Sequence, residues 1–201
     1  SFVLDSFVNF GADPSIKYVA KPHVGTDVLC RVVDNMINHI ISLGGEIQYR
    51  TRFIKPVCSF GEVRGVLTDK GEIEAGALIL AIGHSARDTY RYLIEQNYAV
   101  EAKPMSVGVR VEHLQADIDR ALYGDFAGHP NLGPAEYALS DTKGERGVYT
   151  FCMCPGGEVV AAQSEENTVV VNGMSNYKRD GKNANSAIVV QINREDYGNT
   201  P

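Results

Sequence analysis

Residues 78–90 read LILAIGHSARDTY, and this stretch decides which fold the sequence predicts. An apolar run ends at Gly83, and a polar cluster begins at once. The run predicts a strand that is covered on both faces. Ser85 is placed to cap the helix that follows, with Asp88 at the spacing of a capping box. Because a helix N-terminus also binds anions and polar cofactor edges, the junction predicts either a capped turn or a cofactor contact.

The clearest helix lies upstream of this junction. Apolar residues recur in pairs every four positions between residues 28 and 41, which puts them on one stripe. Thr26 or Asp27 is expected to cap this helix, and Gly44 suits the position after its end. A second helix is expected from Ser85 to about residue 97. Strands are expected at residues 46–49, 53–60, 62–68 and 77–82, the last of them wholly buried.

The second half of the chain predicts a separate module that begins around residues 99–106. A short helix is expected over residues 114–124, and a long loop rich in Gly, Pro and Asp over residues 125–147. Residues 176–186 are expected to form a polar loop. Strands are expected at residues 107–113, 148–152, 158–163, 168–172 and 187–192. The pattern is that of an α/β chain of the mixed α+β kind.

Composition limits the classes of function. The chain has 201 residues, is 44% hydrophobic and 22% charged, and carries a net charge of −6. The acidic balance argues against a nucleic-acid partner and suits a protein that binds a small molecule. We expect no membrane span and no signal peptide. Four cysteines, one Cys-x-Cys pair among them, predict a reducing cytoplasm and no metal site.

Several long motifs resemble one family. They are AKPHVGTD (20–27), LILAIGHSARDTY (78–90), KPMSVGVRVEH (103–113), GVYTFCMCPGGEVV (147–160) and VVNGMSNYKRDGKNANSAIVV (170–190). Together they resemble the little-characterised FAD-dependent dehydrogenases, sometimes labelled NAD-utilising. These are relatives of the two-domain, glutathione-reductase-like flavoproteins. The resemblance covers residues from about 15 to 198.

The resemblance implies an FAD-dependent oxidoreductase of unknown small-molecule substrate, with NAD(P)H as a candidate second partner. It implies a partial FAD-binding, Rossmann-like domain with a β-meander over residues 21–103. A mixed-sheet substrate or cap domain is implied over residues 104–201, with residues 1–20 as part of it. The G-x-G-x-x-G loop of such enzymes does not occur in this sequence. We therefore expect an internal segment of a longer enzyme, inactive by itself.

Two rival functions remain open at this point. The first is a flavoprotein-like module with a non-redox or RNA-modifying role, against which the acidic balance speaks mildly. The second is a non-enzymatic α/β binding domain. The substrate and the oligomeric state are not predicted.

The resemblance also indicates candidate site residues. Backbone or side-chain contacts to the cofactor are expected from Gly83, His84 and Ser85. Lys21 and His23 precede the clearest helix, where related flavoproteins bring a loop near the flavin. They are candidates to stabilise reduced flavin or an acidic substrate, and the alternative is an ordinary surface loop.

Other candidates come from residue types and their positions. Arg110 lies on an apolar strand and suits a carboxylate or phosphate partner, although an ion pair with Glu112 is the ordinary alternative. Cys152 and Cys154 invite a redox role, but a Cys-x-Cys disulfide is strained, so packing is favoured. The backbone of Pro155, Gly156 and Gly157 is expected to approach the cofactor or a neighbouring strand. A polar turn is expected either to line a substrate pocket or to be a solvated loop, and its candidate residues are Arg179, Asp180, Asn183 and Asn185.

Overall fold

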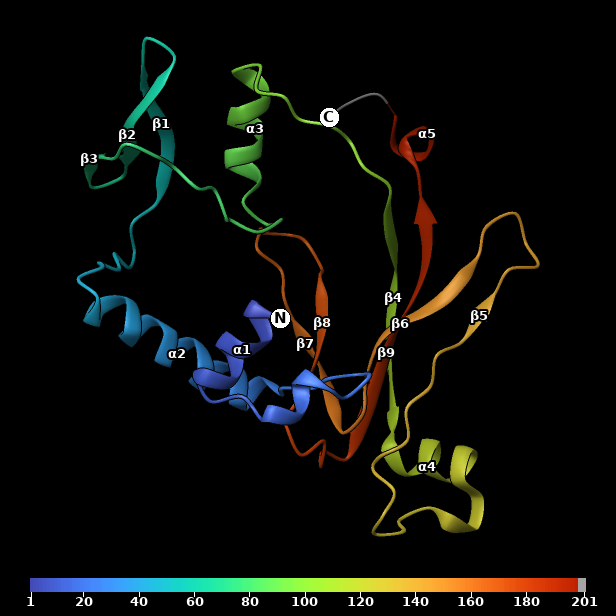
Figure 1. The fold of residues 1–201 in the computed structure, drawn as a ribbon. Coiled ribbons are helices and arrows are strands. Elements are labelled where there is room, and N and C mark those ends of the chain that lie inside the picture. Colours follow the sequence, from blue (N-terminus) through green and yellow to red (C-terminus); the bar gives the residue numbers. More distant parts are fainter. Residues whose placement is uncertain (199–201) are drawn as a thin grey trace. The chain divides into compact units, whose positions relative to one another are not determined.

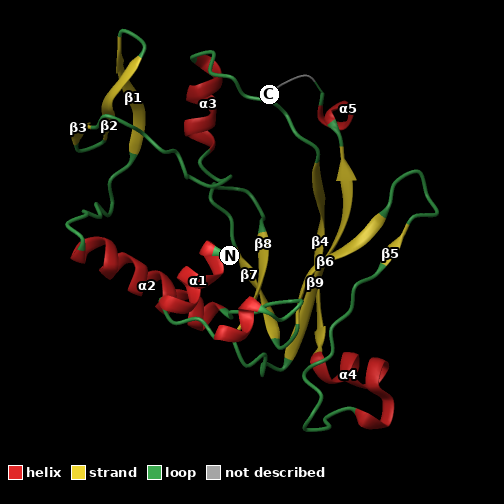
Figure 2. Ribbon diagram, viewed as in Figure 1, coloured by secondary structure: helices red, strands yellow, loops and turns green. Residues whose placement is uncertain are grey.

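The structure is a computed structural model that describes residues 1–198. The chain divides into two compact units, coloured by sequence in Figure 1 and by secondary structure in Figure 2. Unit 1 comprises residues 1–45 and 104–193, and unit 2 comprises residues 46–103 and the residues from 194 on. Residues 21–45 thus group with the second half of the chain, which differs from the expected boundary at residue 21. The functional domains stay a prediction, and residues 199–201 of the expected last domain lie outside the described residues.

The N-terminal part of unit 1 is helical. It consists of α1 (Phe2–Asn9), the 3-10 helix η1 (Pro14–Lys17) and α2 (Thr26–Ser42). Ala12, Ile16 and Val32 form its small buried core. The periodicity of the sequence correctly predicted α2, because the side of the helix that carries Val32 packs against the preceding helices.

The main sheet of unit 1 is antiparallel, with the strand order β4-β9-β6-β5. Arg110 on β4 lies opposite Ala187 on β9, and Glu112 lies opposite Asn185. The pairing of β6 with β9 is interrupted by a bulge between Phe151 and Cys154. The strand bounds are β4 (Met105–Leu114), β5 (Ser140–Asp141), β6 (Val148–Cys154) and β9 (Asn183–Ile192).

A separate hairpin completes the β-structure of unit 1. Strands β7 (Gly157–Ala161) and β8 (Val171–Ser175) pair with each other in antiparallel register. The short helix α4 (Gln115–Tyr123), predicted from the sequence, follows β4 directly and continues into η2 (Gly124–Phe126). The expected polar loop 176–186 is wrong at its end, because β9 begins at Asn183.

Unit 2 contains a three-stranded antiparallel meander, as the sequence predicts. Its strands are β1 (Phe53–Ser59), β2 (Glu62–Thr68) and β3 (Gly71–Glu74), in that spatial order. Pro56 therefore lies on an edge strand, one of the positions expected for a residue that cannot donate to a ladder. The helices of this unit are α3 (Arg87–Glu95) and α5 (Arg194–Tyr197).

Three predictions for unit 2 are wrong. Residues 46–49 and 77–82 have no strand structure, and Ile79 in the supposedly buried run is 90% exposed. Among the described residues the meander consists of β1, β2 and β3 only, and the run pairs with none of them. Helix α3 begins after Ala86, and no side chain caps it. Asp88 instead accepts a hydrogen bond from Nε of Arg52 at 3.1 Å.

The protein is thus a mixed α/β chain with several antiparallel sheets. Between residues 1 and 198, no helix combines the length and the apolar character that a membrane crossing requires.

Candidate functional site

A cavity of about 450 Å³ lies in unit 1. Its walls come from the loop before α2, the first turns of α2, the end of β6, strand β8 and the turn after β8. The expected site residues Lys21, His23, Pro155 and Arg179 line it together. The other lining residues are Pro22, Val24, Gly25, Thr26, Leu29, Glu136, Cys152, Met153, Cys154, Gly173, Met174 and Ser175.

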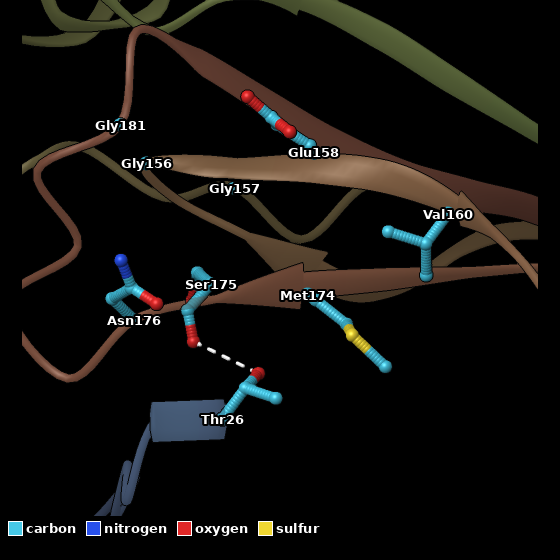
Figure 3. A pocket seen from close by; sticks show the side chains of 9 residues that line it. All are labelled: Thr26, Gly156, Gly157, Glu158, Val160, Met174, Ser175, Asn176 and Gly181. Atoms are coloured by element: carbon cyan, nitrogen blue, oxygen red, sulfur yellow. Dashed lines mark hydrogen bonds between the residues drawn. The ribbon is translucent and has the colours of Figure 1, made fainter. Parts of the chain in front are cut away.

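The start of α2 is fixed to the segment that follows β8. Thr26 Oγ1 donates to the Ser175 carbonyl at 3.2 Å, as Figure 3 shows. The amide of Tyr177 donates to Asp27 Oδ1 at 2.8 Å, and this hydrogen bond lowers the pKa of the Asp27 carboxyl. Thr26 and Asp27 were expected to cap α2, but the N-cap is Gly25 and no side chain caps the helix. Both side chains hold the helix against the cavity wall instead.

Gly25 makes this docking possible. It is buried, and its backbone has φ +79, in the left-handed region that favours glycine. A Cβ atom at this position would overlap the backbone of Tyr177. His23 lies beside it and forms a hydrogen bond from Nε2 to the Asn176 carbonyl at 2.9 Å. The loop before α2 is therefore a wall of the cavity that is fixed by its contacts with Asn176 and Tyr177.

Three charged side chains meet at the cavity. Nζ of Lys21 lies 3.0 Å from Oε1 of Glu136, and Nη1 of Arg179 lies 3.8 Å from Oε2 of the same carboxylate. The Nε atom of Arg179 is buried and has no hydrogen-bond partner among the described residues. One carboxylate thus faces two cations, and one of these cations has a donor to spare.

The backbone of Arg179 holds its side chain in place. Arg179 has φ +54, and its amide donates to the Asn176 carbonyl at 3.0 Å. Its own carbonyl lies so close to Gly156 that a Cβ on Gly156 would overlap it. The guanidinium therefore projects from a tight turn that is packed against a glycine.

The Cys-x-Cys pair lines the cavity at the bulge of β6. Cys152 has φ +51, and its carbonyl accepts hydrogen bonds from Arg110 Nη1 at 3.2 Å and from Cys154 Sγ at 3.4 Å. Burial raises the pKa of the Cys154 thiol, the neighbouring Cys152 raises it further, and Arg110 acts in the opposite direction. Both cysteines are free thiols. Their redox role stays untested.

Arg110 has an internal position. Nη1 donates to Oδ1 of Asn185 at 2.6 Å, and Asn185 is fully buried. Glu112, expected as the ordinary partner of Arg110, accepts instead from the Asn183 side chain at 2.8 Å and from the Val159 amide at 2.6 Å. Asn183 and Asn185 thus belong to β9 and to its packing, which corrects their placement in a loop. Asp180, the acidic candidate of the same stretch, is exposed.

Gly156 and Gly157 line a second, adjoining cavity of about 270 Å³ (Figure 3). Pro155, Gly156 and Gly157 are buried, and the Gly156 amide donates to Oε1 of Gln115 at 2.9 Å. A Cβ on Gly157 would meet the Met174 carbonyl and the Ser175 Cβ. Close approach to neighbouring backbone therefore explains both glycines, and a contact to the cofactor stays a prediction.

The junction at Gly83 lies in unit 2. Gly83, His84 and Ser85 are exposed, and Gly83 has φ +67, where an added Cβ would meet no atom within 4 Å. Its carbonyl accepts a hydrogen bond from the Tyr90 hydroxyl at 3.1 Å. These three residues are open to a ligand, and their contact to a cofactor stays a prediction.

Sequence reasoning missed Glu136 and Met174. Glu136 lies in the long loop between α4 and β6, where no periodic pattern marks it, and it meets Lys21 over 115 sequence positions. Met174 lies in β8, which begins at Val171, three residues later than expected. Across residues 1–198, no three side chains of His, Cys, Asp or Glu gather closely enough to hold a metal ion.

Comparison with known proteins indicates the class of protein to which the second half of the chain is similar. Residues 104–201 match the family described as "FAD-dependent protein, C-terminal domain-like". The matched segment supplies Glu136, the β6 end, β8 and Arg179 to the cavity. This part of the chain is therefore similar to a flavoprotein module and supports an association with FAD.

A relative from Clostridium beijerinckii is 47% identical over 204 residues, and its printed name is "Uncharacterized protein". The match covers 100% of this chain and 38% of the relative, so the chain spans less than two fifths of the relative's length.

Proposed function

We propose that this chain is part of an FAD-dependent oxidoreductase, in which a small-molecule substrate exchanges hydride with FAD and NAD(P)H is the second redox partner. The observation that carries the proposal is the cavity of unit 1. It joins charged and apolar side chains from the FAD-dependent C-terminal-like segment to a loop fixed at the start of α2. A concave site with few polar groups among apolar walls is the usual form of a small-molecule site.

The residues present fit FAD only in part. Gly83 offers open space and a left-handed backbone, which suits the close approach of a planar ring. The sequence contains no G-x-G-x-x-G loop to hold the pyrophosphate. FAD would supply the hydride acceptor when bound, and the residues of this chain would contact it rather than anchor it.

The proposed division of labour follows from these placements. Residues 21–103 would contribute to a Rossmann-like FAD-binding domain, and residues 104–201 to the substrate or cap domain. The apolar run 77–82 supports the first assignment, because its backbone pairs with no strand of residues 1–198 and Ile79 is 90% exposed. An unpaired apolar segment of this kind is suited to join a sheet with other polypeptide.

The cavity residues would bind and orient the substrate. Lys21 and Arg179 are placed to hold a negative charge, and the apolar side chains around them exclude water from the ligand body. His23 is held through Nε2 by the Asn176 carbonyl, so the ring has a fixed orientation at the cavity wall. Arg110 would have a structural role, because it holds the strands next to the cavity through hydrogen bonds to Cys152 and Asn185.

The test uses the full-length relative from Clostridium beijerinckii. It should purify with the visible absorption of oxidised flavin, and NADH or NADPH should bleach that absorption without oxygen. A protein that takes up no flavin, even when refolded with FAD, contradicts the proposal. If flavin is present and neither nicotinamide reduces it, the dehydrogenase part is wrong.

A further inference from the structure

We infer that the 450 Å³ cavity of unit 1 binds a small organic monocarboxylate with an apolar body, and that Lys21 and Arg179 are its charge partners. The inference rests on the proposed function, because it names the substrate class of the same site.

The charge of the cavity wall favours a single negative charge. Lys21 and Arg179 are the cations of the wall, and Glu136 is its carboxylate. These two cations and one carboxylate leave one unbalanced positive charge. A monoanion would neutralise it, whereas a phosphate, with nearly two charges at neutral pH, would also be repelled by Glu136.

Arg179 has the donors that a carboxylate requires. Its Nε atom is buried and unpartnered among the described residues, and its Nη1 is 3.8 Å from Glu136, beyond ordinary hydrogen-bond length. A guanidinium binds a carboxylate through two parallel N–H groups. The tight turn fixes the backbone of Arg179, so binding has to order only its side chain.

Apolar side chains of the same wall specify the body of the ligand. Six side chains provide this surface: Pro22, Val24, Leu29, Met153, Pro155 and Met174. A cavity of this size accepts a molecule of several carbon atoms, because small-molecule sites measure roughly 300–1,000 Å³. Charge at one end and apolar wall at the other together indicate a carboxylate with an aliphatic or aromatic chain.

The experiment measures binding of hexanoate to the whole chain by NMR titration, with hexanamide, hexylamine and inorganic phosphate as comparisons. Hexanoate should bind saturably, and hexanamide at least about tenfold more weakly, because one charged hydrogen bond is worth about 1.4 kcal/mol or more. Equal binding of hexanoate and hexanamide, or tighter binding of phosphate, overturns the inference.

Variants locate the site. Arg179→Gln should weaken hexanoate binding at least about tenfold, while Lys178→Gln, an exposed neighbour outside the cavity, should not change it. Glu136→Gln should tighten binding several-fold, because it removes the competing carboxylate. Lys21→Gln is a second test, since 71% exposure of the Lys21 side chain makes misfolding no explanation for a weaker affinity. If Arg179→Gln and Lys21→Gln both bind like Lys178→Gln, the inference is wrong.

These measurements need no flavin. Hexanoate binding by a chain whose full-length relative takes up no FAD would leave the carboxylate site standing and remove the oxidoreductase. If NADH reduces the full-length relative but the chain does not bind hexanoate, the oxidoreductase proposal stands and the carboxylate site is wrong.

Discussion

Arg110 on β4 donates from Nη1 to Oδ1 of Asn185 on β9 at 2.6 Å, next to Gly173 in the cavity wall. Asn185 is fully buried, and the same Nη1 also reaches the Cys152 carbonyl at 3.2 Å. One guanidinium group thus links three of the four strands of the unit 1 sheet: β4, β9 and β6.

Replacement of Arg110 should cost stability rather than ligand affinity alone. In Arg110→Met the carbonyl oxygen of the buried Asn185 side chain loses its charged donor, so the free energy of unfolding should fall by about 2–3 kcal/mol. Urea denaturation of the whole chain measures this. Arg120→Met is the matched control, because Arg120 is 69% exposed in its pair with Asp117 and should cost less than about 1 kcal/mol. Equal losses in the two variants would contradict the structural role of Arg110.

Gly173 should not tolerate a methyl group. A Cβ there would overlap Oδ1 of Asn185 and Nη1 of Arg110, so Gly173→Ala must displace the pair. We expect a loss of about 1–3 kcal/mol in the free energy of unfolding. Gly133→Ala, where a Cβ meets no atom within 4 Å, should change it by less than about 0.5 kcal/mol. Two thermal melts compare them directly, and a neutral Gly173→Ala would show that the strands move apart at no cost.

The docking of α2 should depend on acid pH. The Tyr177 amide lowers the pKa of Asp27 from its ordinary 3.8, so the folded state favours the carboxylate. The stabilisation is present above pH 3.8 and is lost as the pH falls through the lower folded value. The Tyr177 amide resonance should titrate below pH 3.8, and Asp27→Asn should abolish that titration. Asp34→Asn, on the same helix, should leave it unchanged.

Cys154 should react slowly with iodoacetamide. Burial raises the pKa of its thiol above the ordinary 9.0, and only the thiolate is alkylated. Peptide mapping at pH 8 should show Cys154 modified several-fold more slowly than the exposed Cys30 and Cys58. Cys152→Ser should accelerate Cys154, because it removes a neighbour that raises the pKa. Equal rates for the three thiols would be inconsistent with the burial of Cys154.

Local patterns predicted the elements whose stability is local. The apolar stripe of α2 and the alternation of β4 are written in consecutive residues, and both elements appear where expected. The run 77–82 shows the limit of such patterns. Apolar composition reports that a segment prefers burial, but the partner that would bury it is a matter of tertiary structure.

The candidate site was predictable in its parts and not in its assembly. The family resemblance indicated Lys21 and His23, and residue type indicated Arg179, yet nothing in the sequence brings them to one cavity with Glu136. The bulge at Cys152 was also invisible, because a cysteine at positive φ has no sequence signal of the kind that glycine provides. Polar Asn183 and Asn185 resembled loop residues, although both lie in β9, where their side chains form hydrogen bonds with Glu112 and Arg110 of β4.

Thr26 and Ser175, whose contact fixes one wall of the cavity, stand 149 positions apart in the chain. At a synthesis rate of roughly 5–20 residues per second, the ribosome needs on the order of ten seconds to go from one to the other. Ala12, Ile16 and Val32, by contrast, are close in sequence, so the packing of the N-terminal helices requires no residue from the second half of the chain. The cavity is complete only after Arg179, which lines it together with Lys21 and His23, has been synthesised, so its two walls meet late in translation.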